Sequence, residues 1–166
     1  MPEKETLERA QEDAREGKSP STQAGEFVRE EMHHIREGKH GAASTKQAIA
    51  IGLSKARRAG VKLQPPKEGT SSPQVRKKAE QDTRKAEAHG RKTSAKRSRA
   101  TSKALKREGH DAASPLSLSR QGRQSARKRG ATARHEAAMK AVRTKGKAGM
   151  RSAAKKAART RARHSR

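Results

Sequence analysis

The sequence predicts a mostly α-helical chain with extensive disorder. We expect a small N-terminal helical hairpin of two to three helices, followed by a long basic, largely disordered tail with nascent helices. Apolar residues make up 28% of the 166 positions, whereas globular domains contain about 45–50%. Burial therefore cannot offset the entropy of ordering the whole chain. The net charge of +26 adds self-repulsion to this deficit.

Charge and large apolar side chains are distributed in opposite ways. Residues 1–63 carry 12 Lys or Arg and 10 Asp or Glu, whereas residues 64–166 carry 31 and 7. Of the larger apolar residues, 11 lie before position 64 and 7 after it. We therefore expect four segments: an acidic N-terminal helix at 1–18, a helical hairpin domain at 19–63, a Pro/Gly/Ser linker at 64–74, and a basic Lys/Arg/Ala-rich tail at 75–166.

Two helices are expected before residue 40. The first covers residues 2–16 and ends at a glycine, and the second begins at about residue 19 and ends at Gly38. In the second, Val28, Met32 and Ile35 recur at positions i, i+4 and i+7, which places them on one face of a helix.

The third helix has the clearest signals. Ser44 and Gln47 have the spacing of a capping box. Ile49 and Leu53 form an apolar stripe, and Gly60 occupies the position of a left-handed helix terminator. A short connection to the second helix predicts a helical hairpin. Its core is small, so we expect it to need the first helix, a ligand, or self-association through residues 1–63.

Part of this region resembles a known family. Residues 25–29 (GEFVR), 37–41 (EGKHG) and above all 44–61 (STKQAIAIGLSKARRAGV) carry the likeness. Residues 19–63 as a whole resemble a small basic bacterial domain family of uncharacterised function with a KQAIAIGLS-ARRAG-like core. The resemblance implies a bacterial protein, sometimes labelled as DNA-binding, without an established activity or site. The tail resembles histone-like Lys/Arg/Ala-rich tails in composition only.

The sequence offers little for catalysis, so we expect no enzyme, catalytic residue, cofactor or metal. It has no cysteine, and no nucleophile–base ordering or phosphate-cradling glycine loop. Glu30 and His34, like His33 and Glu37, have the i, i+4 spacing of metal ligands on one helix face. We interpret them as a solvated polar face. No apolar run is long enough for a transmembrane helix, so we expect no membrane partner.

The excess of positive charge predicts a polyanionic partner, and we expect duplex DNA rather than RNA. Backbone binding to a duplex needs Lys, Arg and hydroxyl groups, whereas single-strand binders stack bases on aromatic rings. The only aromatic residue here is Phe27. The residues expected to contact nucleic acid are Lys46, Lys55, Arg57, Arg58, Arg76, Lys77, Lys78, Lys96, Arg97, Arg99, Arg127, Lys128, Arg129, Lys155, Lys156, Arg159, Arg161 and Arg163.

These features predict a non-enzymatic, largely sequence-independent DNA-binding protein of the nucleoid-associated, histone-like kind, located in the cytoplasm. We call residues 1–63 the head. The head would position the basic tail on the duplex, or it would self-associate and so bring several tails together. Three alternatives remain open. The second and third helices could form a helix-turn-helix. The head could be a protein-interaction module with the tail as a nucleic-acid or ribosome tether. The protein could also be an RNA-binding factor.

Overall fold

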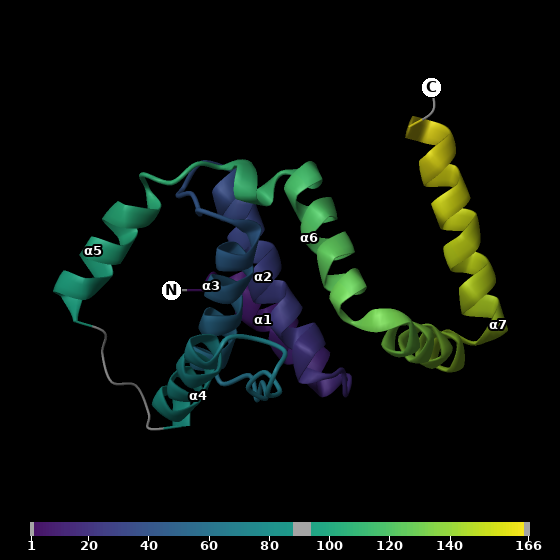
Figure 1. Ribbon diagram of the computed structural model, residues 1–166, viewed down its shortest axis with the longest axis horizontal. Helices are drawn as coiled ribbons and strands as arrows, with labels where there is room; N and C mark the ends of the chain where they lie inside the picture. The colour runs from purple at the N-terminus through teal and green to yellow at the C-terminus, as the bar shows by residue number, and fades with distance from the viewer. Residues whose placement is uncertain (1, 88–93, 165–166) are drawn as a thin grey trace. The chain divides into compact units, whose positions relative to one another are not determined.

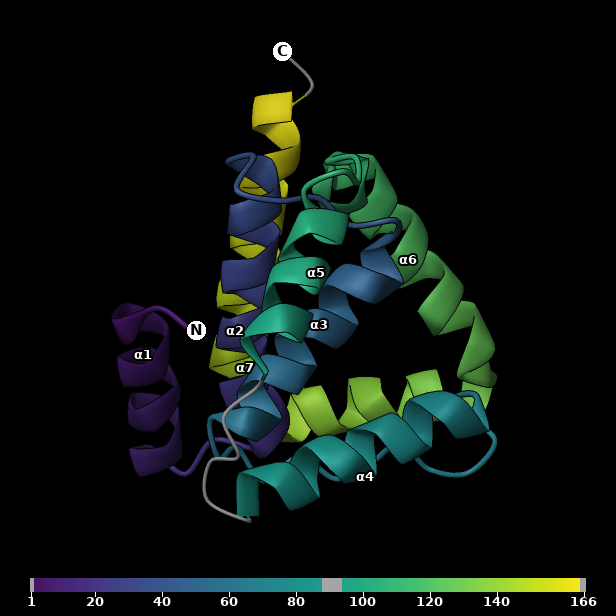
Figure 2. The ribbon, with the colours of Figure 1, turned by 90° about the vertical axis from the view of Figure 1, so that its left-hand side faces the viewer.

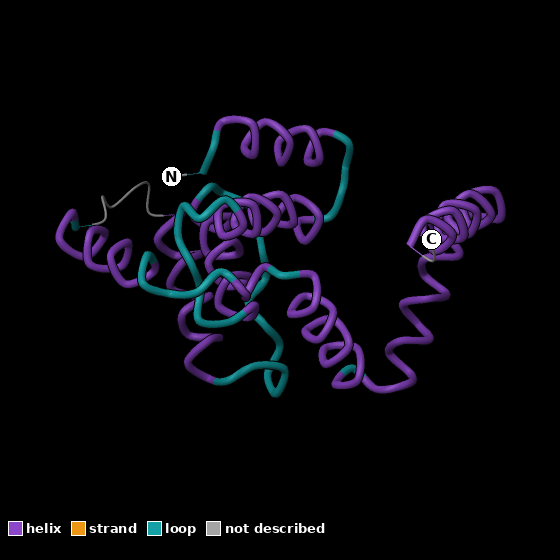
Figure 3. The backbone as a smooth tube through the Cα atoms, turned by 90° about the horizontal axis from the view of Figure 1, so that it is seen from above, coloured by secondary structure: helices purple, strands orange, loops and turns teal. Residues whose placement is uncertain are grey.

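The computed structural model describes residues 2–87 and 94–164, and within these ranges it contains helices and no strand (Figures 1 and 3). The elements are α1 (Lys4–Arg15), α2 (Pro20–Arg36), α3 (Thr45–Arg58), α4 (Pro73–Glu87), α5 (Ala95–Leu105), the 3₁₀ turn η1 (Asp111–Ala113), α6 (Pro115–Lys128) and α7 (Gly130–His164). None of the helices in these ranges is both long and apolar enough to cross a membrane. By its internal contacts the chain divides into a unit that ends at Gln121 and a unit that begins at Gly122.

Local signals explain the ends of the first three helices. Ser44 caps α3, because its Oγ accepts a hydrogen bond from the Gln47 backbone N–H at 3.2 Å. The Gln47 side chain in turn accepts a hydrogen bond from the backbone N–H of Ala43, one residue earlier than in a standard capping box. Gly38 and Gly60 follow α2 and α3 with positive φ, as expected for helix terminators.

The core of the first unit lies around α2 and α3, which pack side by side (Figure 2). α1 packs against α2, α4 against α3, and η1 against both α2 and α3. One apolar cluster has the buried residues Met32, Ile35, Ala42, Ala48, Ala112 and Ala113, and the other has Ala10, Ala24, Phe27 and Ala56. Because most of these side chains are alanine, the helices have small apolar contacts and approach closely.

The end of α5 and the segment between α5 and α6 complete the first cluster. The backbone N–H of Gly41 donates to the Leu105 carbonyl at 2.9 Å, and the hydroxyl of Thr45 donates to the Ala112 carbonyl at 2.6 Å. A Cβ at Gly41 would lie 2.0 Å from the carbonyl oxygen of Glu108, so only glycine fits there. The α2–α3 loop is therefore held by residues more than 60 positions later in the sequence.

In the second unit, the end of α6 leads into α7, whose residues are exposed or half-buried up to Arg163. α7 consists of two helical stretches, because Gly146 has φ 63° and ψ 178° and interrupts the helix. Alanine accounts for 11 of the 35 residues of α7. Its high helix propensity favours helix here in spite of the many like charges.

The prediction of a mostly α-helical protein is confirmed, but the predicted hairpin with a long disordered tail is wrong. Helix is the regular secondary structure of the described residues, and 77% of the chain is helical. The hairpin is not a separate element, since α1, α4 and η1 share its core. Over residues 75–87 and 94–164, which the structure describes, the tail is largely helical rather than intrinsically disordered, for two reasons. Ala, Lys and Arg are good helix formers, and Ala112 and Ala113 are buried against the head.

Replacing Gly52 by Ala is expected to destabilise the first unit. Gly52 is buried on α3, and an added Cβ would lie 2.7 Å from the Cα of Val28 on α2. Overpacking of this kind costs about 1–3 kcal/mol. The matched control is Gly25→Ala on α2, where nothing lies within 4 Å of the added Cβ. That substitution should stabilise by about 0.5–1 kcal/mol, and chemical denaturation of both variants would show opposite signs.

Candidate nucleic-acid interface

Among the residues that the structure describes, the basic side chains of α5, α6, α7 and their connections have no acidic ion-pair partner. Residues 94–164 contain 22 Lys or Arg against three Asp or Glu. All 22 are exposed. Within the part of the chain that the structure describes, every ion pair lies before residue 88. These helices therefore present unneutralised positive charge to solvent.

The expected contact residues of this region lie on three helices and one connection. Lys96, Arg97 and Arg99 are on α5. Arg127 and Lys128 end α6, and Arg129 follows them. Lys155, Lys156, Arg159, Arg161 and Arg163 lie on the last part of α7. All are exposed.

Two of the expected contact residues are instead withdrawn into the protein. The side chain of Lys55 is 17% exposed, and its Nζ lies 2.6 Å from Glu31 Oε2 and 3.4 Å from Glu30 Oε1. Arg57 is 8% exposed. Burial lowers the pKa of the Arg57 guanidinium, and the nearby Asp82 carboxylate opposes that shift. We exclude both side chains from the interface.

The remaining expected residues of the head and of α4 are divided. Lys46 and Lys77 are exposed without an ion-pair partner among the described residues, and Arg58 is exposed with its Nε bonded to the Ser54 carbonyl. On α4, Arg76 pairs with Glu68 and Glu80, and Lys78 pairs with Asp82. The acidic residues of α4 thus neutralise part of its basic surface.

Several basic residues of the interface were missed, and most of them stand alone in the sequence rather than in runs. Arg99 and Lys103 of α5, with Lys106 and Arg107 just after it, line a shallow, open hollow together with Ser102. Arg99 was expected, whereas Lys103, Lys106 and Arg107 were missed. Spacings of three and four residues place such side chains on one side of a helix. A search for lysines and arginines at helical spacing from Arg99 would have found Lys103, Lys106 and Arg107. The other missed residues are Arg120, Arg123, Arg134, Lys140, Arg143, Lys145, Lys147 and Arg151.

Phe27, the single aromatic residue of the sequence, is not available for stacking on bases. It is 1% exposed and packs in the second apolar cluster between α1, α2 and α3. A protein that stacks unpaired bases places aromatic rings on its surface. The exposed basic helices have no such ring.

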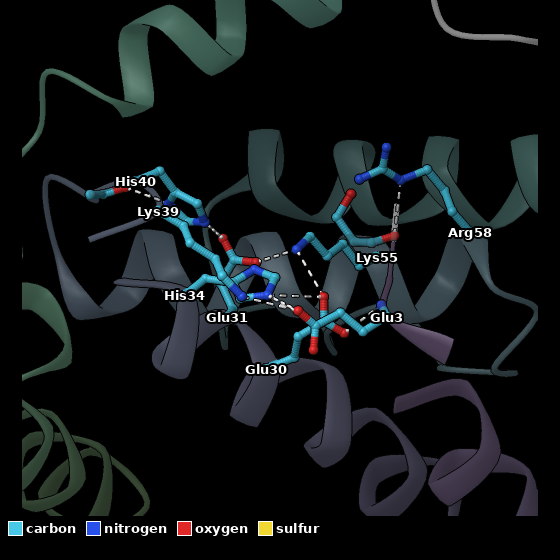
Figure 4. Close-up of polar contacts among 10 residues, drawn as sticks. Glu3, Glu30, Glu31, His34, Lys39, His40, Lys55 and Arg58 are labelled. Atoms are coloured by element: carbon cyan, nitrogen blue, oxygen red, sulfur yellow. Dashed lines mark hydrogen bonds and ion pairs between the residues drawn. The ribbon is translucent and has the colours of Figure 1, made fainter. Parts of the chain in front are cut away.

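A cluster of charged and imidazole side chains lies in the head (Figure 4). Glu30 and Glu31 of α2 are buried, at 4% and 0% exposed. They face Lys55 of α3, and Glu31 Oε1 also lies 3.2 Å from His40 Nε2. A solvated polar face was expected for the acidic and histidine residues around α2. His33 and Glu37 are exposed as expected, but Glu30 and Glu31 are buried and His34 is half-buried. The sequence pattern did not reveal the burial, because i, i+4 spacing is the same on an exposed and on a buried face.

The outer edge of this cluster is formed by the residue before α1. Glu3 Oε1 lies 2.8 Å from His34 Nε2 and 3.2 Å from Lys39 Nζ. Hydrogen bonding to His34, and then to Lys39, lowers the pKa of Glu3. Hydrogen bonding to Glu37, and then to Glu3, raises the pKa of Lys39. Both shifts favour the charged forms, so Glu3 accepts hydrogen bonds here and donates none.

The sequence comparisons concern the head of the chain. Neither a curated protein nor a solved structure matches the sequence. The likeness of residues 19–63 to an uncharacterised family falls within the part that does match, which contains α2, α3 and most of the loop after α3. Residues 17–68 match the model of a family of unknown function, DUF6496.

Proposed function

We propose that this protein is a non-enzymatic DNA-binding protein that neutralises duplex phosphates with little sequence preference, as nucleoid-associated proteins do. The observation that carries the proposal is the set of 22 exposed Lys and Arg after residue 94, none of which has an ion-pair partner among the described residues. By contrast, 9 of the 18 Lys and Arg before residue 88 are in ion pairs. Unpaired charge at this density favours a polyanion, because binding releases its condensed counterions.

A duplex fits these side chains better than a single strand does. Contacts to phosphates need positive charge and hydroxyl donors, and the hollow beside α5 offers Arg99, Lys103 and Ser102. Stacking of unpaired bases needs exposed rings, and Phe27 is buried. Anionic membranes are disfavoured, because an interfacial helix inserts a bulky apolar face. α7 has Met139, Val142 and Met150 as its only larger apolar residues.

The burial and pairing of basic side chains on α3 argue against recognition of base sequence by this helix. A recognition helix presents polar side chains to base edges in the major groove. Of the basic residues at the end of α3, Lys55 is paired with Glu31, and Arg57 is buried. Only Arg58 remains exposed there. We therefore propose contacts to the backbone, with the head holding the basic helices.

The salt dependence of binding tests this proposal. If about ten phosphates are contacted, the slope of log K against log salt should be about −9 for duplex DNA. Replacing Arg159, Arg161 and Arg163 of α7 with Gln should reduce the size of the slope by up to about 2.7, at 0.9 per lost contact. Affinity should fall for all duplex sequences alike. Fluorescence anisotropy with two labelled duplexes of unrelated sequence would measure both quantities.

A control with the same change of charge separates phosphate contacts from general electrostatics. Lys4, Lys18 and Arg29 are in ion pairs with neighbouring acidic residues. Their triple replacement by Gln should leave the slope close to that of the wild type. An equal effect of both triple variants would contradict an interface on α7. Displacement of the duplex by an equal nucleotide concentration of single-stranded homopolymer, or preference for structured RNA, would contradict the assignment to DNA.

A further inference from the structure

We propose that Glu31, His34 and His40 form a binding site for a divalent transition metal of the Zn²⁺ type, which ties α2 to the α2–α3 loop. One ligand atom from each of these residues lies within 4.8 Å of the other two. Glu31 and His34 are on α2, and His40 is in the loop between α2 and α3. Two imidazoles and one carboxylate are a ligand set that suits Zn²⁺ and related ions.

The protonation of His40 leaves a place for a cation. His40 Nδ1 lies 3.0 Å from the Gly41 carbonyl oxygen. A carbonyl only accepts, so Nδ1 carries the hydrogen and Nε2 of the neutral ring has a lone pair. That lone pair faces Glu31 Oε1 at 3.2 Å. Two acceptors at this distance repel each other unless a proton or a metal ion lies between them.

The spacing of these two atoms is that of ligands on one metal ion. With Zn–N of about 2.05 Å and Zn–O of about 2.1 Å, neighbouring tetrahedral ligands are about 3.4 Å apart. His40 Nε2 and Glu31 Oε1 are 3.2 Å apart. The bond from His40 Nδ1 to a backbone carbonyl is the outer hydrogen bond that orients a metal-bound histidine. His40 is therefore held in the position of a ligand.

His34 is prepared in a similar way. Its Nε2 lies 2.8 Å from Glu3 Oε1, and the charged Glu3 carboxylate only accepts, so Nε2 donates and Nδ1 is the nitrogen available to a metal. A carboxylate that receives the other ring N–H of a metal-bound histidine is a common outer partner. The ligand atoms of the three residues lie within 4.8 Å of one another, and a tetrahedral edge is about 3.4 Å, so they need to approach by up to about 1.4 Å when a metal binds.

The buried carboxylate of Glu31 provides the charge for the ion. Both of its oxygens are buried, and neither has a hydrogen bond of normal geometry. Lys55 Nζ now lies against Oε2 as an ion pair, and it is also 3.4 Å from Glu30 Oε1. When a metal binds Glu31, Lys55 keeps Glu30 as its partner. Glu3, Glu30 and Glu31 together balance the lysine and a divalent ion.

A titration of the metal-free full chain with Zn²⁺, followed through the histidine ring resonances by NMR, tests the site. We expect the His34 and His40 signals to change and to saturate at one equivalent. His33 on the same helix and His110 are exposed and lie outside the cluster, so their signals should not follow. Equal changes at all four rings, or none at His34 and His40, would overturn the proposal in favour of a protonated His40 paired with Glu31.

Variants give a second, independent readout. Zn²⁺ should raise the unfolding temperature of the wild type and of the matched control His33→Ala, because it binds the folded state. His34→Ala and His40→Ala should each weaken binding by more than the about 10–100-fold lost with an outer partner alone. Retention of the wild-type affinity in both variants would overturn the site. If either variant does not fold, the NMR titration of the wild type still decides.

Discussion

Phe27→Ala is expected to abolish stable folding of the first unit. Phe27 is the largest fully buried side chain of the described residues, at 1% exposed. It packs with Ala10, Ala24 and Ala56, which cannot fill the space that it would leave. Removal of a buried Phe costs about 3–5 kcal/mol, against a total stability of about 5–15 kcal/mol for typical domains. A unit whose core is mostly alanine has little stability in reserve.

Differential scanning calorimetry would measure this loss. Circular dichroism is less suitable, because α5 to α7 contribute helix that does not depend on the cluster around Phe27. The unfolding peak of the head should move down by on the order of 15 °C or disappear. Leu116→Ala is the control, since Leu116 is 60% exposed and its removal should change stability by no more than about 0.5 kcal/mol. Equal transition temperatures in the two variants would contradict the packing around Phe27.

The helices of the head follow from local sequence signals, and this explains why they could be predicted. The expected ranges 2–16, 19–38 and 44–60 contain α1, α2 and α3. Proline, hydroxyl residues and glycine act within one turn of the chain. Val28, Met32 and Ile35 also lie on one apolar face, as their spacing predicts. Each of these signals is complete within about ten residues.

The packing of residues 105–113 could not be predicted in this way. Ala112 and Ala113 carry no periodic pattern, and their burial depends on the distant Arg36, Gly41 and Thr45. Composition was also misleading for the tail. Lack of large apolar residues argues against a core, but it does not argue against helices rich in Ala, Lys and Arg. The contact combines buried alanines with a close approach of the Glu108 backbone to Gly41, and neither feature leaves a clear signal in the sequence.

The residues of the candidate nucleic-acid interface were likewise predictable in part. Exposed runs such as Lys155–Lys156 were predictable, because a highly charged run is nearly always at the surface. Lys55 and Arg57 have the same residue types, yet Lys55 is paired with Glu30 and Glu31, and Arg57 is buried. Which lysine is free is decided by the distribution of acidic groups in space, and this requires the fold.

Lys55→Met should be among the most destabilising single changes in the protein. Glu30 and Glu31 are buried next to the Lys55 ammonium, which lies 3.4 Å and 2.6 Å from them. Methionine preserves the length of the side chain and leaves two buried carboxylates facing each other without this cation. Removing one partner of a buried ion pair costs about 3–5 kcal/mol. The exposed Lys46 of the same helix is the control, and Lys46→Met should cost no more than about 0.5 kcal/mol.

The double variant Lys55→Met, Glu31→Gln distinguishes loss of charge balance from loss of packing. Glutamine keeps the shape of Glu31 and removes one of the two negative charges, so the repulsion left by Lys55→Met is relieved. The two substitutions should therefore be non-additive, with the double variant more stable than the sum of the single losses by about 0.5–3 kcal/mol. Urea denaturation of the four proteins in this cycle measures the coupling. The Lys55 ammonium lies 2.6 Å from the Glu31 carboxylate, and two opposite charges this close and shielded from water must interact. Additive losses would therefore mean that this charge interaction is absent, and that Lys55 stabilises the head only through the packing of its apolar stem.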